Sequence, residues 1–135
     1  MKKDAFIIAI ASLLIISATF AYYVIEKEGG KEKNASINAI LIIDFGNGTA
    51  WHFNLSLENR NATVYKALNK AARQNGFEIK ATYYEEYDSY FIESIAGKGG
   101  NGKYWVYYVN GKMGEVGADK KVVKEGDIIE WKLEG

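Results

Sequence analysis

The stretch from Gly97 to Lys103 reads Gly-x-x-x-x-Gly-Lys, the pattern of a loop that cradles phosphate groups. Such a loop also needs a Ser or Thr after the lysine to hold Mg²⁺, and a helix whose N-terminus receives the phosphate. Here Tyr104 follows the lysine and begins the strand-like run YWVYYV. We therefore expect a flexible connection between strands at this position and no nucleotide site.

Residues for nucleophilic or metal chemistry are scarce. The chain has no cysteine and one histidine, His52, so it offers no thiolate nucleophile and no His-rich metal site. Glu85, Glu86 and Asp88 lie close together but lack the spacing of a dedicated calcium loop, which favours a solvated bend. A hydrolase would need a carboxylate pair or a nucleophile beside a base, and neither is recognisable. We predict that the protein is not an enzyme and has no metal site.

Aromatic side chains are dense between residues 83 and 108, where nine lie within 26 residues. Strand alternation over 103–109 sends Tyr104, Val106 and Tyr108 to one face and Trp105, Tyr107 and Val109 to the other. Aromatic planes with polar tips bind sugars, flat cofactors or proteins at low entropic cost. Cross-strand aromatic pairing that only stabilises the sheet is the alternative explanation.

The N-terminal segment predicts a membrane location. Residues 5–25 contain 21 consecutive uncharged, mostly apolar residues, enough for a helix to cross about 30 Å of hydrocarbon. Lys2 and Lys3 precede this segment, so the rest of the chain should be extracytoplasmic. A retained signal anchor over 1–25 or a secretory signal cleaved after Ala21 both fit, and the apolar length favours the anchor. Cleavage would make the protein secreted.

If the domain is exported, its four Asn-x-Ser/Thr triplets could accept N-linked glycans. These triplets begin at Asn34, Asn47, Asn54 and Asn61. Ten Asn in a chain with ten Ser or Thr give about one such triplet by chance. We therefore predict these four asparagines as glycosylation sites, with chance occurrence and turn chemistry as the alternative.

Residues 26–36 are charged and contain almost no apolar side chain, which predicts a polar tether. The remaining residues, 37–135, are enough for one domain. Lys plus Arg and Asp plus Glu both total 17, so no net field attracts a polyanion, and nucleic acid is excluded as an expected partner.

The periodicity of apolar residues predicts an α+β fold for residues 37–135. Two strands, 37–45 and 51–57, form a hairpin around Gly46-Asn47-Gly48. Thr63 caps a helix that ends near Asn75, and Gly76 stops it. Further strands are expected at 77–84, 90–95, 103–109 and 128–133. This order indicates one mixed sheet with one helix packed across it, a β-grasp-like arrangement.

From Thr63 onward the chain resembles the transcobalamin-like C-terminal domain family, a largely uncharacterised family similar to the small lobe of transcobalamin and intrinsic factor. The residues that carry this resemblance are Thr63 to Leu68, Tyr90 to Ile95, Tyr104-Trp105, Val109-Asn110-Gly111, Gly117-Ala118-Asp119 and Gly126 to Trp131. The resemblance implies a β-grasp-like fold and a cobalamin-like corrinoid as a candidate ligand. In the carriers, that ligand is clamped against a large helical barrel, which is missing from this chain.

The leading hypothesis is a membrane-anchored, exported, non-catalytic binding module for a cobalamin-like corrinoid or a glycan, with no certain cofactor. Its alternative is a structural domain that docks on another cell-envelope protein. The expected ligand-binding residues are Tyr84, Tyr87, Tyr90, Tyr104, Trp105, Tyr107 and Asn110.

Overall fold

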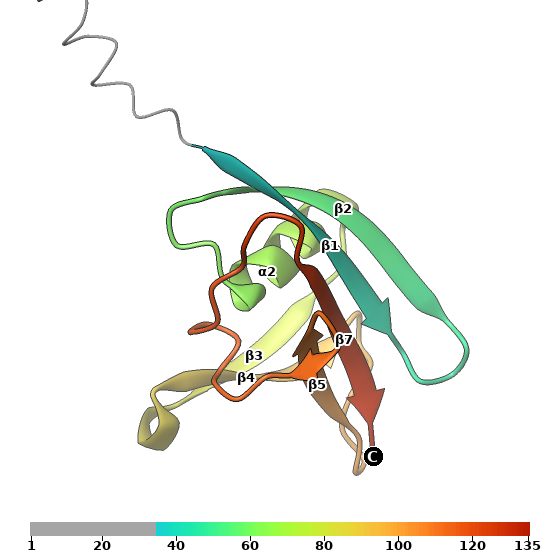
Figure 1. Cartoon of the computed structure of the whole chain (residues 1–135). Coiled ribbons are helices and arrows are strands. Elements are labelled where there is room, and N and C mark those ends of the chain that lie inside the picture. Colours follow the sequence, from blue (N-terminus) through green and yellow to red (C-terminus); the bar gives the residue numbers. More distant parts are fainter. Residues whose placement is uncertain (1–34) are drawn as a thin grey trace, which may run out of the picture. The chain divides into compact units, whose positions relative to one another are not determined.

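The computed structural model describes residues 35–135 (Figure 1). The predicted transmembrane helix (1–25), most of the predicted tether (26–36) and the acceptor Asn34 lie outside these residues. Within the described part, no helix has the length and apolarity needed to cross a membrane.

The chain opens with a hairpin of β1 (Ser36–Asp44) and β2 (Ala50–Glu58). The turn between these strands is closed by hydrogen bonds from backbone N–H groups to the Asp44 and Asn47 side chains, at 2.9 and 3.0 Å. Side chains of β1 alternate as predicted, because Ile37, Ala39, Leu41 and Ile43 are buried and the residues between them are more exposed. The predicted hairpin is confirmed.

Helix α2 (Val64–Asn75) has the predicted ends, and it buries one stripe of side chains: Val64, Ala67, Leu68, Ala71 and Ala72. The Thr63 side chain accepts a hydrogen bond from Lys66 N, and Gly76 closes the helix with φ +72°. The first two helical N–H groups, of Val64 and Tyr65, donate to the carbonyls of Lys121 and Ala118 in a distant loop, both at 3.0 Å. With Ala67 N bonded to Thr63 O, all four N–H groups of the first turn have partners.

A five-stranded mixed sheet has the order β2-β1-β7-β5-β6. Strand β7 (Ile128–Glu134) runs parallel to β1 and antiparallel to β5 (Tyr104–Val109). The short β6 (Lys112–Met113) pairs with the end of β5 and was not predicted, because two residues show no periodicity. Strand β2, at the opposite edge, has no sheet neighbour on its outer side within the described part of the chain.

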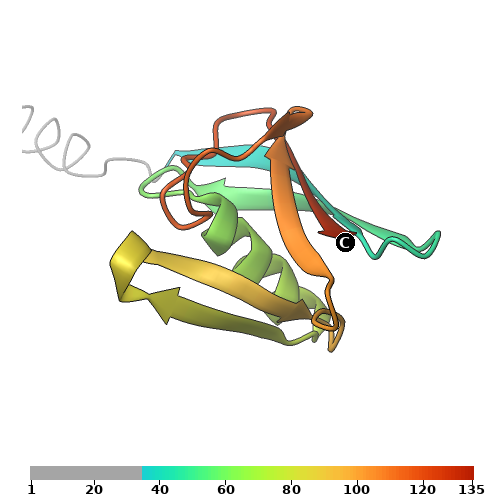
Figure 2. The same ribbon diagram turned by 90° about the horizontal axis from the view of Figure 1, so that it is seen from below.

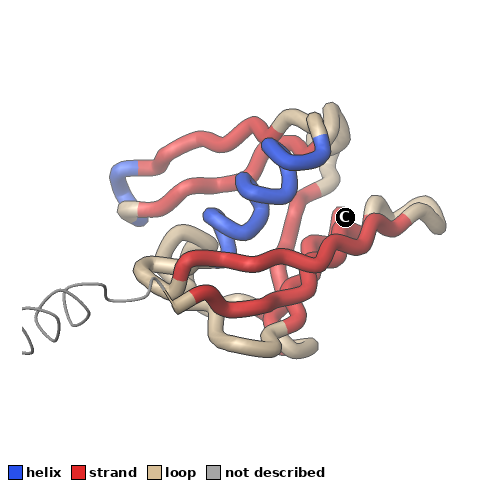
Figure 3. Tube along the Cα trace, turned by 90° about the horizontal axis from the view of Figure 1, so that it is seen from above, coloured by secondary structure: helices blue, strands red, loops and turns tan. Residues whose placement is uncertain are grey.

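The expectation of one sheet is wrong. Strands β3 (Ile79–Tyr84) and β4 (Ser89–Ile95), joined by the 3₁₀ turn η1 (Glu85–Tyr87), form a separate two-stranded sheet. Helix α2 lies between this hairpin and the strands of the larger sheet (Figures 2 and 3). The connection over 96–103 separates the sheets, since six of its residues have positive φ and turn the chain sharply.

The hydrophobic core fills the space around α2. Its fully buried side chains come from both sheets, the helix and the loop before β7: Leu41, Ile43, Val64, Leu68, Ile95, Val123 and Ile129. Among residues 35–135, no element covers the outer face of the five-stranded sheet, which presents Ile40 and Ile128, 39% and 42% exposed. Side chains on this outer face therefore meet solvent.

Candidate ligand-binding site

The structure separates the seven predicted ligand-binding residues into three groups. Tyr84, Tyr87 and Tyr90 belong to the β3–β4 hairpin. Tyr104 and Asn110 stand at opposite ends of β5. Trp105 and Tyr107 point into the core, where they are 4% and 7% exposed. The sequence therefore showed correctly that aromatic residues are dense in this region. In the structure, however, the predicted residues do not form one contact surface.

The predicted ligand contacts of Trp105 and Tyr107 need correction, since both side chains are structural. Trp105 Nε1 donates to the carbonyl of Lys98 at 2.7 Å, and its ring packs edge-on against Phe45. The Tyr107 hydroxyl donates to the carbonyl of Val116, and burial raises its pKa. Alternation along β5 turns both residues toward α2, so neither ring is available to a ligand at the surface.

The β3–β4 hairpin, which we call the tyrosine hairpin (residues 79–95), carries aromatic rings on both faces. On its inner face Tyr90 stacks on Tyr65 of α2, with ring centres 5.1 Å apart, and also contacts Tyr83. On its outer face Tyr84 meets Phe91 edge-to-face at 6.1 Å. Tyr87, at the tip, is 75% exposed. Both alternatives from the sequence are thus present: cross-strand aromatic pairs, and an exposed aromatic surface.

In the acidic bend at the tip of the hairpin, the Asp88 side chain interacts with other residues of the domain. Asp88 accepts a hydrogen bond from the Tyr83 hydroxyl and forms an ion pair with Lys120 at 3.4 Å. These two partners lower the pKa of Asp88, and the same hydrogen bond raises the pKa of Tyr83. Among the described residues, no group of three His, Cys, Asp or Glu side chains is placed to hold a metal ion.

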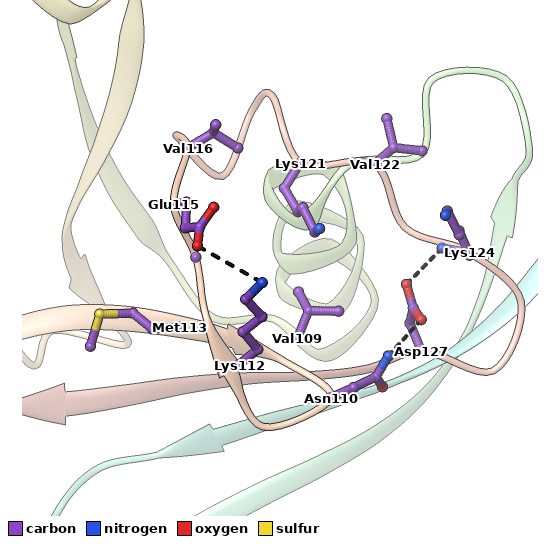
Figure 4. Close-up of a pocket in the computed structure, with 11 residues that line it drawn as sticks. Val109, Asn110, Lys112, Met113, Glu115, Val116, Lys121, Val122, Lys124 and Asp127 are labelled. Carbon is purple, nitrogen blue, oxygen red and sulfur yellow. Dashed lines mark hydrogen bonds and ion pairs between the residues drawn. The ribbon is translucent and has the colours of Figure 1, made fainter.

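A hollow of about 520 Å³ opens beside Asn110, at the β5–β6 turn, and is a candidate site (Figure 4). This volume lies within the range of small-molecule sites, about 300–1,000 Å³. Its walls come from the end of β5, from β6 and from the long loop 114–127. The lining residues are Val109, Asn110, Lys112, Met113, Gly114, Glu115, Val116, Lys121, Val122, Lys124 and Asp127.

The floor of the hollow is fixed by Asn110 and Asp127. Asn110 and Gly111 both have positive φ, which makes the tight turn that a two-residue hairpin requires. The Asn110 amide donates to Asp127 Oδ1 and accepts from Ile128 N, both at 2.9 Å. Asp127 Oδ2 accepts from Lys124 N at 2.9 Å. Asn110 thus lines the hollow, and its side chain is used to hold the turn against β7.

The outer wall of the hollow, loop 114–127, is anchored at three points. Gly114 N donates to Tyr107 O at 3.0 Å, and a Cβ on Gly114 would lie 2.0 Å from Tyr107 Cζ. Asp119 Oδ1 accepts from the Ser89 hydroxyl at 2.9 Å and from Tyr90 N at 3.2 Å. The third anchor is the pair of carbonyls that receive the N-terminal N–H groups of α2. The wall is therefore preformed.

Lysines and apolar side chains share the rim of the hollow. Met113, Val116 and Val122 are all more than half exposed, at 53%, 51% and 55%. Lys112 lies 3.8 Å from Glu115, but both side chains are highly exposed, so this pair is weak. Lys121 and Lys124 form no ion pair with any residue in 35–135. Such a rim suits a ligand with an apolar body and an anionic group.

Sequence reasoning missed most of this site. Loop 114–127 has no periodicity, and Met113, Val116 and Val122 are too far apart in sequence to form a recognisable cluster. The usable signal was the Asn110-Gly111 turn, which predicts a tight hairpin whose second strand must bring Lys112 and Met113 back along β5.

Comparisons with known proteins agree with this architecture. The family model described as "Domain of unknown function (DUF4430)" matches residues 61–135. Haptocorrin in complex with Cbi superposes with a TM-score of 0.60 at 20% identity, over 76% of this chain and 26% of that chain. A Ruminococcus gnavus structure described as a "putative metal binding protein" gives 0.58 at 19% identity, over 73% of this chain and 98% of that one.

These matches confirm the resemblance drawn from the sequence, and at such identities the two structures establish the fold alone. The chain spans about a quarter of the haptocorrin chain, 26%. A search of curated protein sequences finds no match.

Proposed function

The chain belongs to the DUF4430 family, and from this premise we propose that it is a membrane-anchored, exported binding module without catalytic activity. The parallel β1–β7 pair beside the β1–β2 hairpin, with α2 packed across, supports a β-grasp-like fold. The apolar segment 5–25 supports the anchor. Nothing in the hollow beside Asn110 resembles a nucleophile with a base, which supports binding over catalysis.

The observation that carries this proposal is the preformed hollow of Figure 4. The apolar side chains of Met113, Val116 and Val122, which share the rim with Lys112, Lys121 and Lys124, would hold an amphipathic anion. A cobalamin-like corrinoid combines a bulky ring and amide side chains with one negatively charged phosphate group, which the lysines could contact. The fold shared with haptocorrin in complex with Cbi gives further support. A neutral glycan would make less use of the lysines, so the corrinoid is the preferred candidate.

The test is a titration of fragment 31–135 with cobalamin, followed by tryptophan fluorescence and calorimetry. Reversing two charges with Lys121→Glu and Lys124→Glu should weaken binding by about tenfold or more, equivalent to about 1.4 kcal/mol. The matched control makes the same charge change at two remote exposed lysines, Lys80→Glu and Lys98→Glu, and should bind as the parent does. Saturable binding that both double variants retain equally would place the ligand elsewhere.

A second candidate function, docking on another cell-envelope protein, is favoured by the tyrosine hairpin. Tyr84 and Phe91, 45% and 41% exposed, lie on the outer face of the tyrosine hairpin, and Tyr87 is exposed at its tip. A photo-crosslinking residue in place of Tyr87 should then capture one protein in intact cells. The same residue at Lys98, which is exposed but remote, is the control and should capture none.

A further inference from the structure

The outer face of the β1–β2 hairpin combines a modification motif with an uncovered apolar side chain. Asn54 lies in the middle of β2, and its triplet Asn54-Leu55-Ser56 matches the acceptor pattern for N-linked glycans. In the antiparallel register Asn54 stands directly opposite Ile40. Both side chains are exposed, and Ile40 is 39% exposed although it is an isoleucine in a central strand.

A shallow depression of about 450 Å³ lies at this pair. Its lining includes Asn38, Ile40, Asn54, Ser56 and Gly126. The wall formed by Asn38 and Gly126 is held in place, since Gly126 N donates to Asn38 O at 2.8 Å and Glu125 accepts from Asn38 N at 2.6 Å. The floor is apolar, and Ile128, 42% exposed, continues it on β7 beside Ile40. A depression with an apolar floor is thus lined by the acceptor residue Asn54.

We propose that Asn54 carries an N-linked glycan whose first sugar packs on Ile40 in this depression. A pyranose ring has one face of C–H groups, which suits an apolar floor, and hydroxyl groups that suit the polar wall. In the transfer, Asn54 Nδ2 bonds to the anomeric carbon of a lipid-linked oligosaccharide. The bond from that carbon to the lipid pyrophosphate breaks, and the amide proton leaves to solvent. The inference rests on the proposed export, because such donors act outside the cytoplasm.

The position of Asn54 gives the glycan a physical role. Strand β2 is nine residues long and is the open edge of the five-stranded sheet (Figure 1). Long open edges pair with strands of other chains unless they are blocked. Two further acceptors flank the same edge, with Asn47 in the turn before β2 and Asn61 just beyond its end, and both are exposed. A glycan at Asn54 would cover the centre of this edge and the apolar floor beside it.

The experiment is glycopeptide mass spectrometry of the full-length chain isolated from its own cells. The peptide that contains Asn54 should carry a sugar mass. Asn54→Gln and Ser56→Ala should both lose it, while Ser56→Thr, which preserves the triplet, should keep it. An unmodified Asn54 in the isolated protein overturns the proposal. This holds even if Asn47 or Asn61 carries a glycan.

Protease treatment of intact cells tests separately whether the domain is exported. A domain that is digested from outside, together with an unmodified Asn54, overturns this inference and leaves the proposed function standing. A domain that is protected from protease overturns both.

A separate measurement of thermal unfolding tests whether the first sugar packs on Ile40. Enzymatic removal of the glycan should lower the thermal unfolding midpoint of the parent chain, and the decrease should be smaller by at least half in an Ile40→Ser variant. An equal decrease in both proteins would overturn the packing on Ile40. The variant Ile42→Ser, which changes the next outward-facing position of β1, is the matched control and should retain most of the decrease.

Discussion

Asp119 is the residue whose ionisation contributes most clearly to the fold. Its side chain is 14% exposed, and although burial disfavours the charged form, hydrogen bonds from Ser89 and Tyr90 N outweigh burial and lower its pKa. A carboxylate with a lowered pKa in the folded state stabilises the fold fully above its ordinary pKa of about 4. That contribution is lost as the pH falls through the lower, folded-state value.

Asp119→Asn should therefore destabilise the domain at pH 7 by about 1–3 kcal/mol. It should also reduce the decrease in stability of the parent between pH 6 and pH 3, because the substituted amide does not titrate. Urea unfolding of fragment 31–135 across this range measures both effects. Glu115→Gln, at a carboxylate that is 81% exposed, is the control and should follow the parent. A variant with the same pH dependence as the parent would contradict this assignment.

Gly114 is required by the Tyr107 ring, which lies where a Cβ would be placed. Gly114→Ala must displace that ring or the start of loop 114–127, so we expect a loss of about 1–3 kcal/mol. Urea unfolding of Gly114→Ala, of Tyr107→Leu and of the double variant measures the coupling. If the clash is the cause, the two changes together should cost less than their sum. Additive losses would assign the effect to some other property of the loop.

At the scale of elements, the tyrosine hairpin should be the least stable part of the domain. Within the described domain its two strands pair only with each other, and its inner face rests on α2 through few buried side chains, chiefly Ile92 and Ile95. Strands β1 and β7, in contrast, have partners on both sides within the larger sheet. Local opening needs less free energy where fewer buried contacts must be broken.

Hydrogen exchange of fragment 31–135, followed by mass spectrometry, should show amides of 79–95 exchanging faster than those of β1 and β7. The short β6 is a poor reference, because it lies at an edge, whereas α2 is a suitable one. Exchange of the hairpin at the same rate as β1 would indicate that the two sheets unfold as one cooperative unit.

At the scale of the whole molecule, local rules predicted the elements well and their assembly less well. Alternation in β1, the Thr63 cap and the Gly76 stop act within a few residues, so the sequence alone could reveal them. The division into two sheets depends on the backbone angles of 96–103. The hollow beside Asn110 depends on contacts between segments far apart in the chain, such as Asp119 with Ser89. No periodicity encodes contacts of that kind.

The parallel pairing of β1 and β7 also determines how the domain would respond to a pulling force. The chain enters the domain at the start of β1 and leaves it at the end of β7, which lie at opposite ends of the pair because the strands run in the same direction. Tension between the two termini would load the hydrogen bonds that join 40–44 to 128–132 in shear, so that all must break together rather than one after another. A load carried from terminus to terminus would thus meet the most cooperative resistance that the sheet can offer.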